Sequence, residues 1–181
     1  MATVILSLSD LARQEGEWKG NSSQDRELIQ NTLKGDQKAF QELVLRYRER
    51  AYRVAYNFVR DYEEARDISQ EAFIKTYKSL DRFDQTKNFY TWFYRILVNL
   101  CVDQIRKNKK RNVSLDDMGD IVGKRQDPIQ NMETTEIRNQ INDVLHNLPE
   151  KYKALIILRD IEGLSCLDIA KILGCSYTTV R

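Results

Sequence analysis

The chain has 181 residues, of which 41% are hydrophobic and 31% are charged, and its formal net charge is +2. This composition is typical of a soluble protein with one domain or two small ones, and it excludes a polybasic protein that binds through its overall charge. No apolar run reaches the length of a membrane span, and the N-terminus lacks the basic segment of a signal peptide. We therefore expect a cytoplasmic protein that does not insert into a membrane.

Cysteine and histidine usage argues against a metal centre. Cys101, Cys166 and Cys175 form no CxxC motif, and His146 is the one histidine in the sequence. A zinc site needs more ligands than these, and an odd number of cysteines fits free thiols in a reducing compartment. We expect no metal and no cofactor.

The sequence predicts an all-α fold, because glycine and proline are few and helical periodicity recurs along most of the chain. Residues 1–24 lack this periodicity and are expected to form a mobile tail. Helices are expected over residues 25–33, 36–60, 62–80 and 89–109, with Asp61 capping the third of them. The inner side of that third helix is expected to carry Ala65, Ile68, Ala72, Phe73, Thr76, Tyr77 and Leu80. Together these helices predict a first domain over residues 25–110.

Residues 111–132 contain two glycines, a proline and mixed polar residues, which favours a flexible linker. Apolar stripes then return on both sides of Pro149, and they predict a second small helical domain over residues 133–181. No internal repeat is evident.

The last segment, LSCLDIAKILGCSYTTVR, has the spacing of a helix-turn-helix. Ser165 is expected to cap its first helix, Gly174 to supply a left-handed turn, and Val180 to face the core. The second helix would place its opening residues in the major groove of DNA. A plain helical hairpin has similar spacing and is not excluded by the pattern alone. The sequence stops soon after this second helix begins, so we expect the recognition helix to be truncated. Its outward residues are Tyr177, Thr178, Thr179 and Arg181.

Acidic residues gather where the third helix begins, between Asp61 and Glu71, with Arg66 as the one basic residue among them. They favour a solvated face, a favourable charge at a helix N-terminus, or a docking surface for a basic partner. No histidine or paired carboxylate motif on a facing helix supports a metal site.

The stretch from Asn88 to Arg111 combines five aromatic residues within six positions with the basic run RKNKKR. Helical spacing places Phe89, Trp92, Phe93, Ile96, Leu97 and Leu100 on one wide apolar side. Another side carries Arg95, Asn99, Asp103 and Arg106, and a polar and basic stripe above aromatic residues suits nucleic acid. The polar loop from Phe83 to Asn88 is suited to accept a base extruded from the stack. The basic run either binds phosphate or complements the dipole at the helix end.

Four segments resemble bacterial extracytoplasmic-function (ECF) sigma factors: GDQKAFQELVLRY, ARDISQEAFIKTYKSLDRFD, FYTWFYRILVNLCVDQIRK and LPEKYKALIILRDIEGLSCLDIAKILGCSYTTVR. Their order is also that of the family. The resemblance implies a sigma-2 domain, a linker and a sigma-4 domain. It implies a promoter-specificity subunit without catalysis of its own, in which RNA polymerase carries out the phosphoryl transfer.

The resemblance also implies partners and site residues. Residues that match the motif docking on the β′ clamp helices of core RNA polymerase are Asp67, Gln70, Glu71 and Phe73. Residues implied in capturing, melting and reading the −10 promoter element are Phe83, Lys87, Asn88, Phe89, Tyr90, Trp92, Arg95, Asn99 and Arg106. The second domain would contact the β flap and read the −35 element, although the end of the chain at Arg181 puts −35 binding in doubt. A cognate anti-sigma factor is an expected further partner.

Two functions of other classes remain as alternatives. A one-component helix-turn-helix regulator would bind duplex DNA without polymerase, but it would need neither the acidic helix nor the polar loop. A metal-dependent nucleic-acid enzyme is weakened by the lack of ligands.

Overall fold

The computed structural model describes residues 22–115 and 148–181, and every regular element within these two ranges is helical. The first range holds α2 (Ser22–Leu33), α3 (Gln37–Val59), α4 (Tyr62–Ser79), the short 3-10 helix η1 (Leu80–Arg82) and α5 (Phe89–Leu115). The second holds α7 (Glu150–Ile156), the π-helical turn η3 (Ile157–Ile161), α8 (Cys166–Leu173) and α9 (Tyr177–Val180). The predicted all-α fold is confirmed.

Helix ends follow the local chemistry that the sequence predicts. The Asp61 carboxylate accepts the Glu64 N–H at 2.9 Å and begins α4, and the Ser165 hydroxyl accepts the Asp168 N–H at 3.1 Å and begins α8. Gly174 has φ 64° and ends α8 in the left-handed region, where a side chain would be strained. These three predictions are confirmed.

Small residues allow α3 and α4 to lie close together. Ala51 and Ala55 on α3 and Ala65 and Ala72 on α4 have no exposed surface. Large rings fill the space that remains toward α5, where Phe93 stacks on Phe73 with ring centroids 4.8 Å apart. Of the residues expected on the inner side of α4, Tyr77 is placed differently: half of its surface is exposed, and its ring meets the edge of Phe40.

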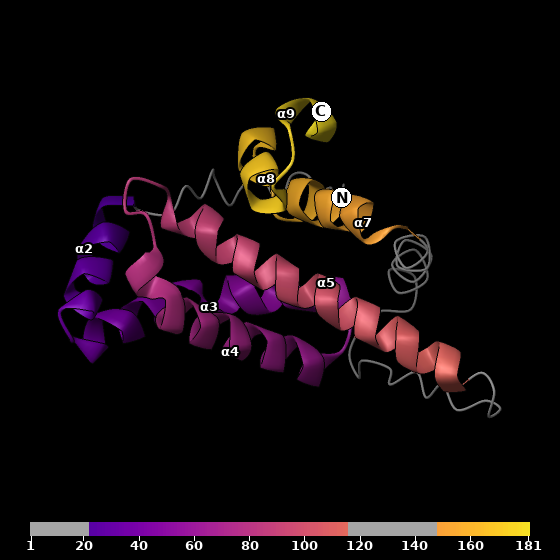
Figure 1. The fold of residues 1–181 in the computed structure, drawn as a ribbon, viewed down its shortest axis with the longest axis horizontal. Helices are drawn as coiled ribbons and strands as arrows, with labels where there is room; N and C mark the ends of the chain where they lie inside the picture. The colour runs from indigo at the N-terminus through magenta and orange to yellow at the C-terminus, as the bar shows by residue number, and fades with distance from the viewer. Residues whose placement is uncertain (1–21, 116–147) are drawn as a thin grey trace, which may run out of the picture.

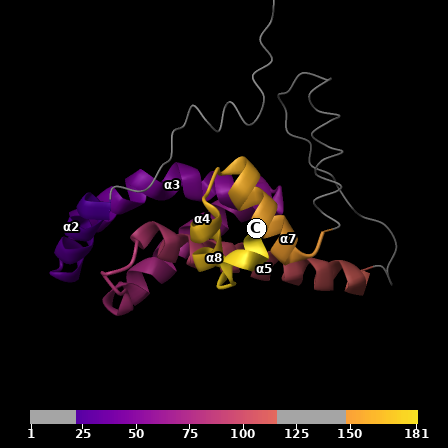
Figure 2. The ribbon, with the colours of Figure 1, turned by 90° about the horizontal axis from the view of Figure 1, so that it is seen from above.

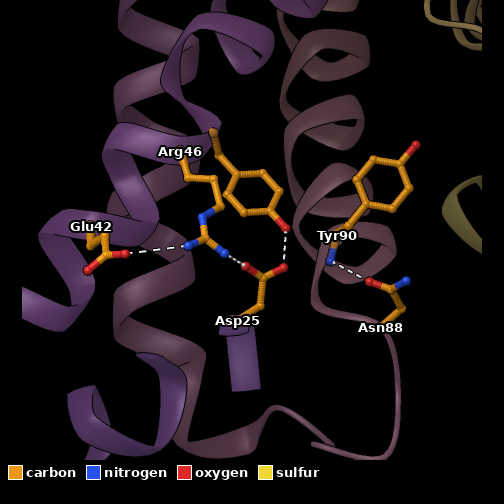
Figure 3. Close-up of polar contacts among 6 residues, drawn as sticks. Asp25, Glu42, Arg46, Asn88 and Tyr90 are labelled. Carbon is orange, nitrogen blue, oxygen red and sulfur yellow. Dashed lines mark hydrogen bonds and ion pairs between the residues drawn. The ribbon is translucent and has the colours of Figure 1, made fainter. Parts of the chain in front are cut away.

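The helix α2 is anchored by a buried carboxylate. Asp25 on α2 accepts a hydrogen bond from the Tyr47 hydroxyl at 2.6 Å and pairs with the Arg46 guanidinium at 2.8 Å. Figure 3 shows both contacts beside the start of α5, where Asn88 and Tyr90 lie. The helix that was expected to begin at residue 25 begins three residues earlier, at Ser22, so that Asp25 lies inside it.

The remaining helices cover α5 from the opposite side to α4. α8 and α7 both pack against α5, and η3 contacts α3 (Figures 1 and 2). α5 itself continues to Leu115, into the segment expected to be a linker. Most of that segment, most of the expected tail and the helix expected before Pro149 lie outside the described residues.

Candidate nucleic-acid interface

The outer face of α4 carries the residues expected to contact a protein partner. Asp67, Gln70 and Glu71 are exposed, while Phe73 is half-buried because its ring stacks on Phe93. Glu71 forms an exposed ion pair with Lys75 at 3.1 Å. Beyond these residues the surface is apolar, since Ile74 is 53% exposed and Tyr77 is 50% exposed. This face offers carboxylates beside exposed hydrophobic side chains, as a protein-binding surface does. The sequence did not single out Ile74 and Tyr77 as exposed.

The loop from Phe83 to Asn88 is fixed at both ends. Phe83 is buried, with its ring 4.8 Å from Trp92 and 5.8 Å from Phe89. At the other end the Asn88 side-chain oxygen accepts the Tyr90 N–H at 3.1 Å and begins α5. Between these anchors Lys87 is exposed. The loop is therefore anchored at both ends and exposes Lys87 between them.

Asp84 organises the middle of this loop. Its carboxylate accepts hydrogen bonds from the Thr86 hydroxyl at 2.7 Å and from the Thr86 N–H at 3.0 Å. These bonds, first among them the hydroxyl, lower the pKa of Asp84, and the nearby Lys87 ammonium acts in the same direction. The loop keeps its negative charge at neutral pH, next to the positive charge of Lys87.

On α5, Arg95, Asn99 and Arg106 are exposed and share one side, as the periodicity predicts. Trp92 is partly buried at the beginning of this side. Phe89 and Tyr90 are only 4% and 2% exposed. In this conformation Phe83, Phe89 and Tyr90 therefore lie beneath the surface, whereas Lys87 and Arg95 are exposed.

α5 has a second buried side that the sequence did not predict. It carries Tyr90, Tyr94, Val98 and Cys101, which are at most 2% exposed. Burial is the main cause that raises the pKa of both tyrosines, and the Glu162 carboxylate raises each further. The Asp168 carboxylate of α8 acts on Tyr90 in the same way. Both carboxylates belong to residues 148–181, called the second module below. They show that this module packs against this side of α5.

The helix-turn-helix has the expected arrangement in its described part. Ser176 caps α9 through the Thr179 N–H at 3.3 Å, and its hydroxyl also lies within hydrogen-bonding distance of the Thr178 and Thr179 hydroxyls. Val180 is 4% exposed and faces the core. Tyr177, Thr178, Thr179 and Arg181 are exposed, as the spacing predicts. The opening residues of α9 are thus presented to solvent.

Sequence reasoning missed three residues that join the two helical modules. Arg50 and Arg53 on α3 both pair with Glu162, which directly follows η3. The one available signal was the spacing of Arg50 and Arg53, which places two cations on the same side of a helix. Glu162 gave no signal, because it precedes a glycine and lies outside the apolar stripe.

Two classes of feature are absent from the described ranges. Across residues 22–115 and 148–181, no three His, Cys, Asp or Glu side chains gather in a way that could hold a metal ion. No helix in these ranges is both long and apolar enough to span a membrane.

Family comparisons agree with this geometry. A model of Sigma-70 region 2 matches residues 43–111, and a model of Sigma-70 region 4 matches residues 138–181. The RNA polymerase sigma-H factor of Pseudomonas aeruginosa is 35% identical over 167 residues, which cover 87% of this chain and 86% of that protein. The ECF RNA polymerase sigma factor SigW of Bacillus subtilis is 37% identical, with 84% and 87% covered.

Solved structures give the same fold. CnrH, in complex with the cytosolic domain of CnrY, aligns with a TM-score of 0.65 at 25% identity over 87% of each chain. The sigma factor RpoE of Bartonella quintana, in complex with the anti-sigma factor NepR, aligns with a TM-score of 0.61 at 23% identity, over 79% of this chain and 88% of that one. With two Sigma-70 region models matched in order and relatives above 30% identity over most of its length, the chain belongs to the ECF RNA polymerase sigma factors.

Proposed function

We propose that this chain gives core RNA polymerase its promoter specificity in the cytoplasm and has no catalytic activity of its own. The observation that carries the proposal is the presence, in one chain of this family, of three separate exposed surfaces. These are the acidic and apolar face of α4, the loop and polar side of α5, and the opening residues of α9. A regulator that binds duplex DNA alone would use only the last of them.

We assign polymerase docking to α4. Asp67, Gln70 and Glu71 face solvent, and Phe73 holds this face to the core by stacking on Phe93. Exposed Ile74 and Tyr77 extend the surface with apolar area that a protein partner would cover. Carboxylates at the rim favour a basic partner surface such as the β′ clamp helices.

Charge reversal tests this docking surface. The double variant Asp67→Lys/Glu71→Lys should weaken binding to core polymerase at least tenfold, because two attractive contacts become repulsive. The matched control is Glu27→Lys/Glu49→Lys, which makes the same charge change at exposed positions of α2 and α3. Equal binding by the two double variants would remove α4 from the assignment.

We assign the −10 element to the loop over 83–88 and the polar side of α5. Buried Phe83 and Phe89 hold the loop, and Lys87, Asn88, Arg95, Asn99 and Arg106 supply cations and amides around it. Rings beneath a polar rim suit the capture of an unstacked base, whose extrusion costs roughly a few kcal/mol. Tyr90 and Trp92 complete the support on α5.

The −35 element is assigned to α9, with Tyr177, Thr178, Thr179 and Arg181 as the contacts. Thr and Tyr hydroxyls bind phosphates or base edges, and Arg reads guanine or holds phosphate. The second module would also meet the β flap of the polymerase. Residues 22–115 and 148–181 would then act as two promoter-reading modules, joined through a segment outside the described residues.

An anti-sigma factor is the further partner that we propose. CnrH, which matches this chain over most of its length, is in complex with the cytosolic domain of CnrY. A partner of this kind would cover the exposed Ile74 and Tyr77 and compete with the polymerase for α4.

A further inference from the structure

A buried carboxylate joins the two helical modules. The Glu162 side chain has no exposed surface and lies between two arginines of α3. Arg50 Nε is 3.2 Å from Glu162 Oε2, and Arg53 Nε is 3.3 Å from Glu162 Oε1. Arg50 Nη2 also donates to the Glu162 backbone carbonyl at 3.2 Å. Two guanidinium groups thus close on one carboxylate, which is the arrangement of an anion site.

The buried surroundings of this carboxylate hold a further donor. Charges of Glu162 and Arg50 act on both Tyr90 and Tyr94, so the two phenols lie near the pair. Within the described part of the chain, the buried Tyr94 hydroxyl has no hydrogen-bond partner. Leaving a buried hydroxyl unpaired is unfavourable. A buried hydroxyl donor near the two arginines is therefore not used by Glu162.

The same packing brings the second module up to the edge of the surface assigned to the −10 element. α8 packs against α5, above which it stands in Figure 1 (see also Figure 2). A Cβ placed on Gly174 would lie 3.5 Å from Arg95 Nη2, so the turn of the helix-turn-helix sits against this arginine. A DNA strand that followed α5 past Arg95 would have to displace the second module. Displacement would separate Glu162 from half-buried Arg50 and from Arg53, whose side chain is already 45% exposed.

We propose that Arg50 and Arg53 bind a backbone phosphate of the single-stranded −10 DNA, and that Glu162 occupies their site in the closed conformation described here. A phosphate accepts the same forked hydrogen bonds from guanidinium groups as a carboxylate does. The assignment rests on the proposed −10 surface of α5, which these arginines adjoin. If only the open form binds DNA, the apparent DNA affinity equals the affinity of the open form multiplied by the fraction of molecules that are open. The second module would thus restrain promoter binding until the two modules separate.

Two variants of the full chain distinguish a phosphate site from a simple latch. Glu162→Gln removes the competing charge and keeps both arginines, whereas Arg50→Ala/Arg53→Ala removes the same ion pairs and also the proposed phosphate site. The probe is a fluorescent single-stranded 20-nucleotide DNA of mixed sequence, because a phosphate contact does not depend on sequence. Binding is measured by anisotropy over a series of salt concentrations. Small-angle X-ray scattering reports separation of the modules, and circular dichroism reports folding.

Glu162→Gln should bind the probe about tenfold more tightly than wild type if the closed form is about ten times as populated as the open form. The double arginine variant should bind more weakly than Glu162→Gln, and its salt slope should be shallower by about 0.7, the value for one phosphate contact on a single strand. Arg50→Lys/Arg53→Lys keeps the charges but not the forks, so it should fall between them. The control Glu42→Gln, an exposed carboxylate of α3, should stay within twofold of wild type.

Three results would overturn the proposal. If Glu162→Gln opens the chain in scattering but does not bind DNA more tightly, Glu162 does not compete with a DNA phosphate for the two arginines. If Glu162→Gln and the double alanine variant gain equally in DNA affinity and have equal salt slopes, the arginines only hold the modules together and do not bind phosphate. If Glu162→Gln binds core polymerase more tightly but not the DNA probe, the two arginines bind an acidic protein segment instead of a phosphate. None of these results affects the promoter assignment, which start-site mapping with the wild-type chain tests separately.

Discussion

The buried carboxylate of Asp25 gives a sharp test of what holds α2 in place. Asp25 is 1% exposed, and Asp25→Asn removes its charge with little change in shape. The Tyr47 hydroxyl, 2.6 Å from the carboxylate, and the Arg46 guanidinium, 2.8 Å away, would then both lose a charged acceptor. α2 also reaches the 83–88 loop, where Gln30 donates to Gln85 at 3.3 Å. Loss of the anchor should therefore loosen the loop as well.

The magnitude follows from burial. Breaking a fully buried ion pair from one side costs about 3–5 kcal/mol, but Arg46 keeps 21% of its surface exposed and recovers part of its hydration. We expect a loss of about 2–3 kcal/mol in the free energy of unfolding, or a fall in Tm of roughly 8 °C. Thermal denaturation followed by circular dichroism at 222 nm measures it.

The control uses the same arginine. Glu42 pairs with Arg46 at 3.4 Å but is 61% exposed, so Glu42→Gln should cost at most about 0.5 kcal/mol. A double-mutant cycle of Asp25→Asn with Tyr47→Phe should give a coupling of about 1 kcal/mol, since a charged hydrogen bond joins the two groups. If Asp25→Asn proves as mild as Glu42→Gln, burial does not set the strength of this anchor.

Further predictions concern Lys153, Gly174 and Asn88. Lys153 is only 7% exposed, and its burial, with Arg60 and Lys109 nearby, lowers the pKa to about 8. Between pH 8 and 10.5 the unfolded chain therefore binds more protons at this residue than the folded one, so stability rises with pH there. Lys153→Met should be more stable than wild type at pH 7, and urea unfolding should show the difference shrinking as pH rises to 10; a difference independent of pH would refute the assignment. Gly174→Ala should cost about 1 kcal/mol in urea unfolding because the residue has φ 64°, and a neutral change would mean that the turn relaxes freely. Asn88→Ala removes the side-chain acceptor that begins α5, and it should reduce promoter opening, measured by permanganate footprinting, more than polymerase binding; equal losses in both would indicate misfolding.

Local chemistry made much of the fold predictable from the sequence. Asp61 and Ser165 predict helix starts because their side chains accept hydrogen bonds from backbone N–H groups. Gly174 predicts a turn because other residues are strained in its left-handed conformation. Exposure of Arg95 and Asn99 followed from period alone. The spacing of the helix-turn-helix likewise predicted that Val180 is buried and that Thr178 is exposed.

Contacts between distant segments were not predictable in this way. Tyr90 and Tyr94 lie outside the apolar side predicted for α5, and the second module packed against α5 explains their burial. Glu162 and Arg50 are 112 positions apart, and no periodic signal connects them. Tyr77 was expected inside, but its ring lies at the edge of α4 against Phe40, where half of it stays exposed.

Start-site mapping with core RNA polymerase is the most direct test of the role proposed for this chain. Purified core enzyme and the chain would be incubated with a genomic promoter library, and the 5′ ends of the transcripts would be sequenced. We predict starts downstream of a shared pair of sequence elements, and loss of these starts with Asp67→Lys/Glu71→Lys but not with Glu27→Lys/Glu49→Lys. Transcripts identical to those made by core enzyme alone, from a chain shown to be folded, would contradict the assignment.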